Sequence, residues 1–178
     1  MKRTSNAGRV RQALRDATMA DHQHVDELYS NFSLGSPVEY GAFLKAHARA
    51  LMPLEQLAQP DSPRLPQLVE DLAVLGESIP EPLTAQGEVN EAFRWGALYA
   101  LEGSRLGGAM LERQVAPGLP RAYLKAGHQK GSWIAFQQAL DAAAEGGGQE
   151  WIDSAVQGAE TAFALFAAGA AAERLNNG

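Results

Sequence analysis

Apolar residues recur at steps of three and four along most of the chain, and no run of alternating β-branched residues interrupts this pattern. The spacing matches the period of an amphipathic α-helix. The abundant Ala, Leu, Glu, Gln and Arg residues are also good helix formers. The sequence therefore predicts an all-α protein, with helices at about 6–29, from 37 to just before Pro60, and at about 67–75, 88–115, 132–144 and 150–175. Residues 121–127 suit either a short helix or an irregular turn.

Proline, serine and glycine residues mark the expected ends of these helices. Ser36 and Pro37 suit the N-cap and first helical position, and Glu39 can complete a capping box. Ser132 is a candidate N-cap for the sixth helix, and the triple glycine at 146–148 predicts a turn. We find no internal repeat, so we expect one domain over residues 1–178, with a flexible tail at 1–6.

Composition narrows the function further. The formal net charge of −6 argues against a nucleic-acid-binding domain, because such domains neutralise phosphates with Lys and Arg. The chain has no cysteine, which excludes disulfides, thiolate metal sites and thiol catalysis. No apolar run approaches the roughly 20 residues that cross a bilayer. We therefore expect a cytoplasmic protein that binds neither nucleic acid nor membrane.

The positions of the four histidines in the sequence predict different environments for their side chains. His47 falls on the apolar face of its helix and is expected to be a hydrogen-bonded core residue, whereas His128 is expected to be exposed. His22 and His24 are two positions apart on a helix, so they point in nearly opposite directions and cannot chelate one metal ion together. A di-iron bundle would also require a second carboxylate–histidine motif, which the sequence lacks.

A polar stripe borders the apolar face of the first helix. It consists of Arg15, Thr18, His22 and Asp26, at steps of three and four. Arg15 lies two turns from His22, roughly 10 Å along the helix axis. This spacing would suit a ligand that binds His22 and carries an anionic group near Arg15, although a solvated helix face explains the same pattern.

The stretch LEGSRLGGAML (101–111) places three glycines inside a predicted helix. Each glycine costs about 1 kcal/mol relative to alanine there. The spacing puts Gly96, Gly103 and Gly107 on nearly one face, with Tyr99 beside them. Either a close helix–helix crossing or a flat ligand lying against bare backbone would explain these glycines, and the sequence alone leaves both open.

Two stretches together resemble the heme oxygenase family. LRDATMADHQHVD (14–26) resembles its proximal-helix motif, and YALEGSRLGG (99–108) resembles the distal-helix motif of its bacterial branch, including members associated with bacteriophytochromes. The order and separation of the two motifs agree with the family over nearly the whole chain. The resemblance implies a single-domain, multi-helical bundle in which heme lies between the proximal and distal helices.

The resemblance also implies roles for individual residues. His22 takes the position of the iron ligand, and Arg15 and Tyr99 take positions that bind heme propionates. Gly103, Ser104 and Gly107 would form the distal catalytic surface, with Ser104 where animal-type members carry an aspartate. The full set of implied heme-binding residues is Arg15, Thr18, His22, Tyr99, Gly103, Gly107 and Gly108.

The activity that this resemblance implies is oxidative cleavage of heme to biliverdin, with release of CO and ferrous iron. Heme would be cofactor and substrate, O2 the oxidant, and an external ferredoxin or reductase the electron donor. A bacteriophytochrome would be the acceptor of biliverdin. Two alternatives remain: a non-catalytic heme carrier or sensor, and a helical interaction module without cofactor. Thiaminase-like relatives of the fold commonly use a cysteine, which this chain lacks.

Overall fold

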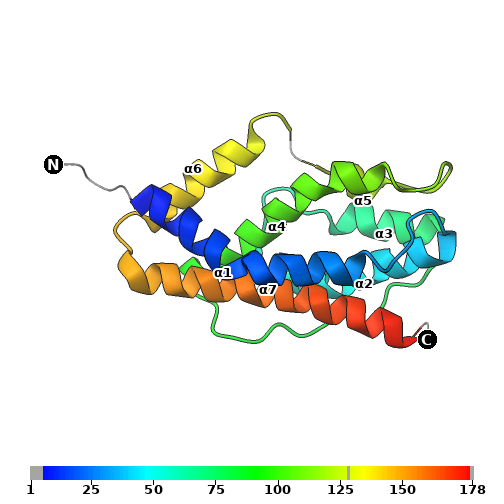
Figure 1. Ribbon diagram of the computed structural model, residues 1–178, viewed down its shortest axis with the longest axis horizontal. Coiled ribbons are helices and arrows are strands. Elements are labelled where there is room, and N and C mark those ends of the chain that lie inside the picture. The colour runs from blue at the N-terminus through cyan, green and yellow to red at the C-terminus, as the bar shows by residue number, and fades with distance from the viewer. Residues whose placement is uncertain (1–5, 128, 177–178) are drawn as a thin grey trace.

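The computed structural model describes residues 6–127 and 129–176, and over these residues the chain is helical with no β-strand (Figure 1). This confirms the predicted all-α class. The helices are α1 (Asn6–Tyr29), α2 (Pro37–Ala58), α3 (Leu65–Val74), α4 (Glu91–Glu112), α5 (Ala122–Lys125), α6 (Ser132–Ala144) and α7 (Gly148–Asn176). None of these helices combines the length and apolar character needed to cross a membrane.

The first two helices begin where their sequence signals predict. α1 starts at Asn6, so this last residue of the expected tail is helical. Ser36 caps α2, and its hydroxyl accepts a hydrogen bond from the Glu39 amide at 3.4 Å. The carboxylate of Glu39 accepts from the Ser33 amide at 3.3 Å instead of returning to Ser36, so only one half of the expected capping box forms.

Other helix ends differ by a few residues from the predicted bounds. α4 begins later than expected because Asn90 is its N-cap, with the side chain accepting from the Phe93 amide at 2.9 Å. Ser132 is the first residue of α6 and not its cap. Gly131 takes the cap position at φ 85°, a left-handed conformation that glycine adopts without steric cost. Its lack of a side chain means that α6 has no side-chain cap.

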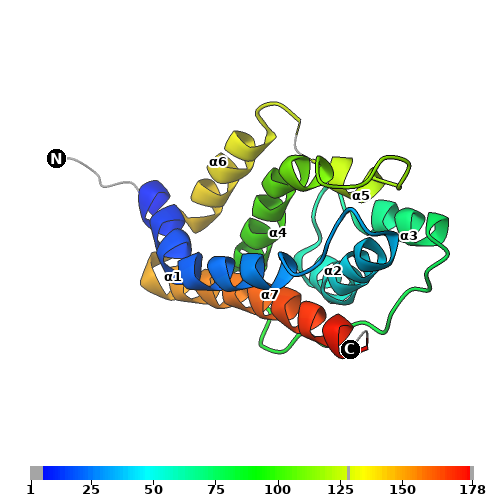
Figure 2. The ribbon, with the colours of Figure 1, turned by 45° about the vertical axis from the view of Figure 1, so that its right-hand side comes forward.

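The long helix α7 lies at the centre of the fold and packs against α1, α2 and α4. Figures 1 and 2 show α1 running beside α7, whereas α4 crosses α7 and then diverges from it. At this crossing Gly96 of α4 lies against the carbonyl of Ala155, and Gly158 of α7 lies against the carbonyl of Phe93. A Cβ atom at either glycine would overlap the facing backbone, so the close crossing depends on both residues.

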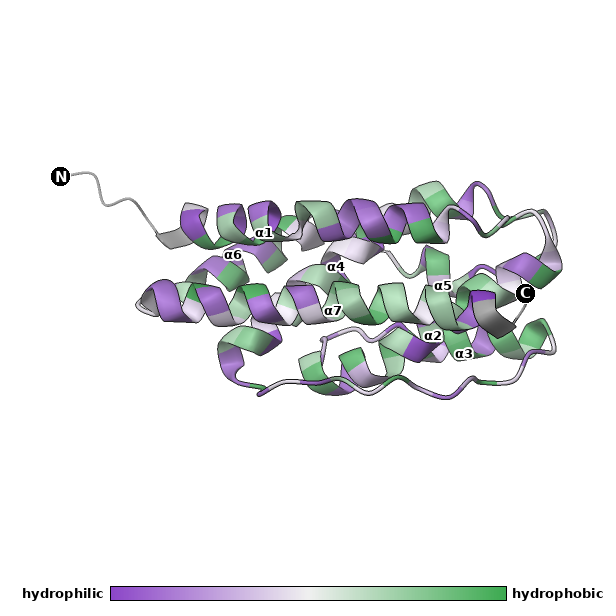
Figure 3. Cartoon of the chain, turned by 60° about the horizontal axis from the view of Figure 1, so that its bottom comes forward, coloured by the Kyte–Doolittle hydropathy of each residue, from purple (hydrophilic) through white to green (hydrophobic). Residues whose placement is uncertain are grey.

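Two hydrophobic clusters flank this crossing. The larger joins α2, α3, α4, α5 and α7. The smaller forms where the N-terminal half of α1 meets α6 and α7, and includes Val10, Leu14, Leu140 and Ile152. Figure 3 shows hydrophilic turns along α1 and a mostly apolar middle of α7. The first turns of α1 are thus fixed in the core, and its polar stripe begins at the edge of that core.

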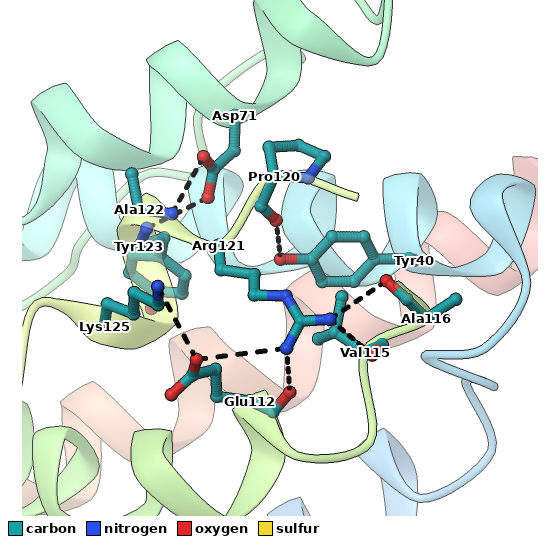
Figure 4. Close-up of polar contacts among 10 residues, drawn as sticks. All are labelled: Tyr40, Asp71, Glu112, Val115, Ala116, Pro120, Arg121, Ala122, Tyr123 and Lys125. Carbon is teal, nitrogen blue, oxygen red and sulfur yellow. Dashed lines mark hydrogen bonds and ion pairs between the residues drawn. The ribbon is translucent and has the colours of Figure 1, made fainter. Parts of the chain in front are cut away.

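Arg121 fixes the C-terminal end of α4 (Figure 4). Its guanidinium donates hydrogen bonds to the carbonyl oxygens of Glu112, Val115 and Ala116 at 3.2, 2.9 and 3.1 Å. The last carbonyls of a helix have no partner within the helix, and a cation near them also complements the helix dipole. Arg121 therefore joins the last carbonyl of α4, the helix that carries the glycine-rich motif, to two carbonyls of the turn that follows it.

Candidate active site

His22 lies on the surface of α1 with its imidazole open to solvent. Its side chain is 65% exposed, and its Nε2 atom lies 3.6 Å from Oδ2 of Asp26 one turn further along. On the other side, the His22 ring lies 5.9 Å from the ring of Phe163 on α7, tilted by 54°. The imidazole is therefore oriented by a carboxylate and an aromatic ring while it remains accessible to an external ligand.

The two other stripe residues of α1 behave differently from one another. Thr18 is buried, and its hydroxyl donates to the Leu14 carbonyl at 2.7 Å, so this donor is used within the helix. Arg15 is exposed and has no hydrogen-bond or ion-pair partner among the described residues. Burial raises the pKa of Tyr99 on α4, and the charge of Arg15 opposes this rise. The positive charge of Arg15 therefore acts on the Tyr99 phenol.

The C-terminal half of α4 presents a surface that we call the glycine face, formed by Tyr99, Gly103, Leu106, Gly107 and Met110. These residues share one side of the helix at its 100° step. A Cβ at Gly107 would have no atom within 4 Å, and one at Gly103 would approach only a side-chain carbon of Trp133, at 3.9 Å. Leu106 and Met110 are 49% and 71% exposed. The face is apolar, and its backbone is bare.

The remaining α4 glycines have a packing function. Gly96 lies at the crossing with α7, and a Cβ at Gly108 would lie 2.7 Å from the carbonyl oxygen of Leu124 on α5. The packing explanation therefore applies to two of these glycines, and the flat-ligand explanation stays a prediction for the other two. Close packing accounts for Gly96 and Gly108, whereas Gly103 and Gly107 have no packing partner that requires glycine.

The hydroxyl of Ser104 points toward a partner that the sequence analysis did not identify. It accepts a hydrogen bond from Nη2 of Arg64 at 2.5 Å and donates to the Leu101 carbonyl at 2.8 Å. The Arg64 guanidinium also lies over the ring of Tyr123, 4.9 Å from its centroid. Arg64 stands in a proline-rich loop before α3, and nothing in its local sequence shows that it contacts α4.

His47 is the hydrogen-bonded core histidine that the sequence predicts. Its Nδ1 atom lies 2.6 Å from the hydroxyl of Tyr123, and the rings of Tyr29, Phe43 and Phe166 surround it. Burial, with a smaller effect from the charge of Arg64, lowers the pKa of His47 to about 3. The imidazole is therefore neutral at physiological pH.

Tyr123, the partner of His47, is held in place by Asp71. The buried Asp71 carboxylate accepts from the backbone amides of Ala122 and Tyr123 at 3.1 and 2.9 Å, which caps the short helix α5 (Figure 4). Burial raises the pKa of Asp71, and these two hydrogen bonds lower it. The position of Tyr123, and with it the contact to His47, thus depends on a carboxylate from α3.

Trp133 on α6 is a further site residue that the sequence analysis missed. Its ring lies 6.1 Å from that of Tyr99 and stacks on Phe136 at 5.6 Å. Together with its approach to Gly103, this makes Trp133 a side wall of the glycine face. An apolar stripe on α6 is visible in the sequence, but the stripe does not indicate which helix it contacts.

A groove of about 370 Å³ lies between α1 and α7, on a different side of α1 from the polar stripe. His24 lines it together with Asp21, Glu160 and Phe163, whereas His22 does not. This agrees with the expectation that the two histidines point in different directions. None of the predicted heme-binding residues lines this groove. His128 lies outside the described residues.

Comparison with known proteins gives a consistent result. No family model matches the chain. A heme oxygenase from Xanthomonas campestris pv. campestris (strain 8004) is 36% identical over 120 residues, which cover 62% of this chain and 68% of that protein. The NO- and CO-bound heme oxygenase from Neisseria meningitidis superposes with a TM-score of 0.74 at 26% identity, covering 96% of this chain and 92% of the other.

The chain belongs to the heme oxygenase family. It is accordingly an enzyme of heme degradation, with heme as its cofactor. The residues of the candidate site fit this group. Exposed His22 offers a nitrogen ligand for iron, the unpaired Arg15 can bind a carboxylate, and the glycine face leaves space for a flat ring at Gly103 and Gly107.

Proposed function

We propose that this enzyme cleaves heme to biliverdin with release of CO and ferrous iron, using O2 and electrons from an external ferredoxin or reductase. We further propose that the biliverdin serves as chromophore for a bacteriophytochrome, and that the enzyme works in the cytoplasm. The observation that carries the proposal is the contrast among the α4 glycines. Gly103 and Gly107 leave space on the exposed face, whereas Gly96 and Gly108 are required for packing.

The residues of α1 would hold and orient the heme. His22 is the proposed iron ligand, and Asp26, 3.6 Å from its Nε2 atom, and the ring of Phe163 limit how its imidazole turns. Such partners fix the orientation of a ligating imidazole. Arg15 is the proposed partner of a propionate, because its guanidinium is the free cation of the stripe.

The residues of α4 would shape the opposite side of the heme. Tyr99 can donate its phenolic hydrogen to a propionate on the side where Arg15 lies. Gly103 and Gly107 bring backbone close to the ring and provide no side chain that transfers protons. Such a wall would limit the space above the ring without offering a proton-transferring side chain. Trp133, Leu106 and Met110 would keep bulk water from this space.

Bound heme supplies the iron that activates oxygen and is itself the ring that is cleaved. The protein contributes ligation, orientation and exclusion of water. The external donor is proposed because the sequence contains no dinucleotide-binding motif of the G-x-G-x-x-G type. The cytoplasmic location rests on the absence of cysteine, which suits a reducing compartment without requiring it.

The proposal is tested by titrating the purified protein with hemin under anaerobic conditions and then adding reductant and oxygen. We expect a Soret band at one heme per chain, followed by conversion to a pigment that chromatography identifies as biliverdin. Stable heme without turnover would instead indicate a carrier or sensor. Absence of heme binding would indicate a helical interaction module.

The link to a bacteriophytochrome requires a separate experiment. The pigment from the reaction is mixed with a bacteriophytochrome apoprotein, with authentic biliverdin as the control. We expect the same red-light-absorbing product in both mixtures. A pigment that the apoprotein does not accept would contradict chromophore supply while leaving heme cleavage intact.

A further inference from the structure

Arg64 is a buried cation whose backbone amide donates to the Glu55 carboxylate at 2.7 Å, while its guanidinium points to α4. Its residue is 4% exposed, and no carboxylate among the described residues forms an ion pair with its guanidinium. Burying a charge without a counter-charge is unfavourable unless its hydrogen bonds are satisfied. The guanidinium uses Nη2 on two groups of α4, the Leu101 carbonyl at 3.4 Å and the Ser104 hydroxyl at 2.5 Å.

These contacts converge on the turn of α4 that contains Gly103. The Leu101 carbonyl, which a regular helix would pair only with the amide of Arg105, also accepts from Ser104 Oγ at 2.8 Å and from Arg64. A helix bends where a serine hydroxyl bonds back to one of its own carbonyls. It also bends where a side chain inserts into its ladder of backbone hydrogen bonds. Two such influences act on one carbonyl here.

The contact acts from the side of α4 that lies away from the glycine face. Leu101 and Ser104 are about 160° and 100° around the helix from Gly103 at the 100° step. Gly103 provides a turn with little resistance to deformation. A displacement of the Leu101–Ser104 turn therefore changes how far the backbone projects at Gly103, which lies nearly opposite Leu101, and at Gly107 in the next turn.

We propose that Arg64 is a positioning residue, which fixes the Leu101–Ser104 turn and thereby sets how closely the glycine face approaches the heme. This inference rests on the proposed function for its consequence at the heme, but the contact itself belongs to the protein alone. It also assigns Ser104 a different role from the expected one. The Ser104 hydroxyl transmits the position of Arg64 to the helix, since its hydrogen is already donated to Leu101.

The test compares wild type with Arg64→Met, Arg64→Lys and Ser104→Ala. Arg94→Met is the control for loss of an arginine at the other end of α4: Arg94 also donates to a carbonyl, of Ala58 at 3.0 Å, and lies 5.4 Å over the ring of Trp95, but it is ion-paired with Glu91 at 2.8 Å. The first measurement is amide hydrogen exchange of the heme-free protein at residues 105–108. The second, on the hemin complex, is the ratio of biliverdin isomers and the pKa of the ferric-heme water.

We expect exchange at 105–108 to rise about tenfold in Arg64→Met, the factor that corresponds to losing a hydrogen bond from a charged donor. Ser104→Ala should change it in the same direction, Arg64→Lys should restore part of the protection, and Arg94→Met should leave it unchanged. In the hemin complex, Arg64→Met should broaden the isomer distribution and shift the pKa of the ferric-heme water.

If folded Arg64→Met shows unchanged hydrogen exchange at residues 105–108, Arg64 does not fix this turn. If the exchange changes but the biliverdin isomers and the pKa of the ferric-heme water stay the same, Arg64 does not position the glycine face. If Arg64→Met yields no native protein, Ser104→Ala decides by the same criteria. Failure of the wild type to bind hemin would refute the proposed function, while the exchange measurement would still decide whether Arg64 fixes this turn.

Discussion

Gly107 and Gly108 are adjacent in α4 and have opposite surroundings. A Cβ at Gly107 would have no atom within 4 Å, whereas a Cβ at Gly108 would lie 2.7 Å from the carbonyl oxygen of Leu124. The same substitution at these two positions therefore separates the effect of packing from the effect on the glycine face.

We expect Gly108→Ala to destabilise the protein by about 1–3 kcal/mol, the usual effect of forcing a methyl group into a packed site. Gly107→Ala should leave stability unchanged or raise it by up to about 1 kcal/mol, because alanine favours helix and space is available. Gly107→Ala should nevertheless weaken hemin binding or alter the product. Urea unfolding measures the change in stability, and hemin titration measures the change in heme binding. Equal losses of stability in Gly107→Ala and Gly108→Ala would contradict the different surroundings of the two glycines.

His22 and His24 provide a second matched pair. His22→Ala should lose the axial nitrogen ligand and change the Soret and EPR spectra of the ferric complex, and added imidazole should restore them. Because the side chain is 65% exposed, stability should change by less than about 0.5 kcal/mol. His24→Ala, which alters only the groove between α1 and α7, should keep the wild-type spectra. Wild-type spectra for His22→Ala would remove His22 as the ligand.

Arg15 is compared with Arg11, one turn earlier. Arg11 forms a two-pronged ion pair with Asp141 at 3.1 and 2.8 Å, whereas Arg15 has no such partner among the described residues. Arg11→Ala should therefore reduce stability by about 0.5–1 kcal/mol without affecting the product. Arg15→Ala should leave stability nearly unchanged and weaken hemin binding or change the biliverdin isomers. Unaltered affinity and isomers in Arg15→Ala would count against a role in binding a propionate.

His47 should make the stability of the heme-free protein depend on pH. Its pKa in the folded protein is about 3, below the ordinary 6.5, so the unfolded chain takes up this proton first as the pH falls. The contribution is complete above pH 6.5 and decreases between pH 6.5 and 3. From pH 6.5 to 5, wild type should lose about 1.6 kcal/mol more than His47→Gln in urea unfolding. Parallel stability profiles would contradict this expectation.

The helices were predictable where local signals define them. The first helix has the predicted bounds, and Ser36 with Pro37 marks the start of α2, because an N-cap and a proline act over a few residues. Ser132 was misassigned as a cap because the sequence offers serine and glycine side by side. The structure uses the left-handed conformation of Gly131 there.

The site was less predictable because its parts come from distant segments. The two motifs placed His22 and Gly103 on the correct helices, but the surroundings of Gly108 depend on Leu124, which follows in a later helix. Arg64 reaches Ser104 across 40 positions. Helical period describes which residues share one face, and it contains no information on which other segment covers that face.

The crossing at Gly96 has a mechanical consequence for the glycine face of α4. Because Gly96 and Gly158 press α4 and α7 together backbone to backbone, the crossing serves as a pivot for α4. Gly107 lies 11 residues beyond it, at the end of a lever arm of about 16 Å. A rotation of about 5° at the pivot would displace Gly107 by about 1.4 Å. Substitutions at Ala155 or Gly158, which face the crossing and not the glycine face, should therefore displace Gly107 without contacting it.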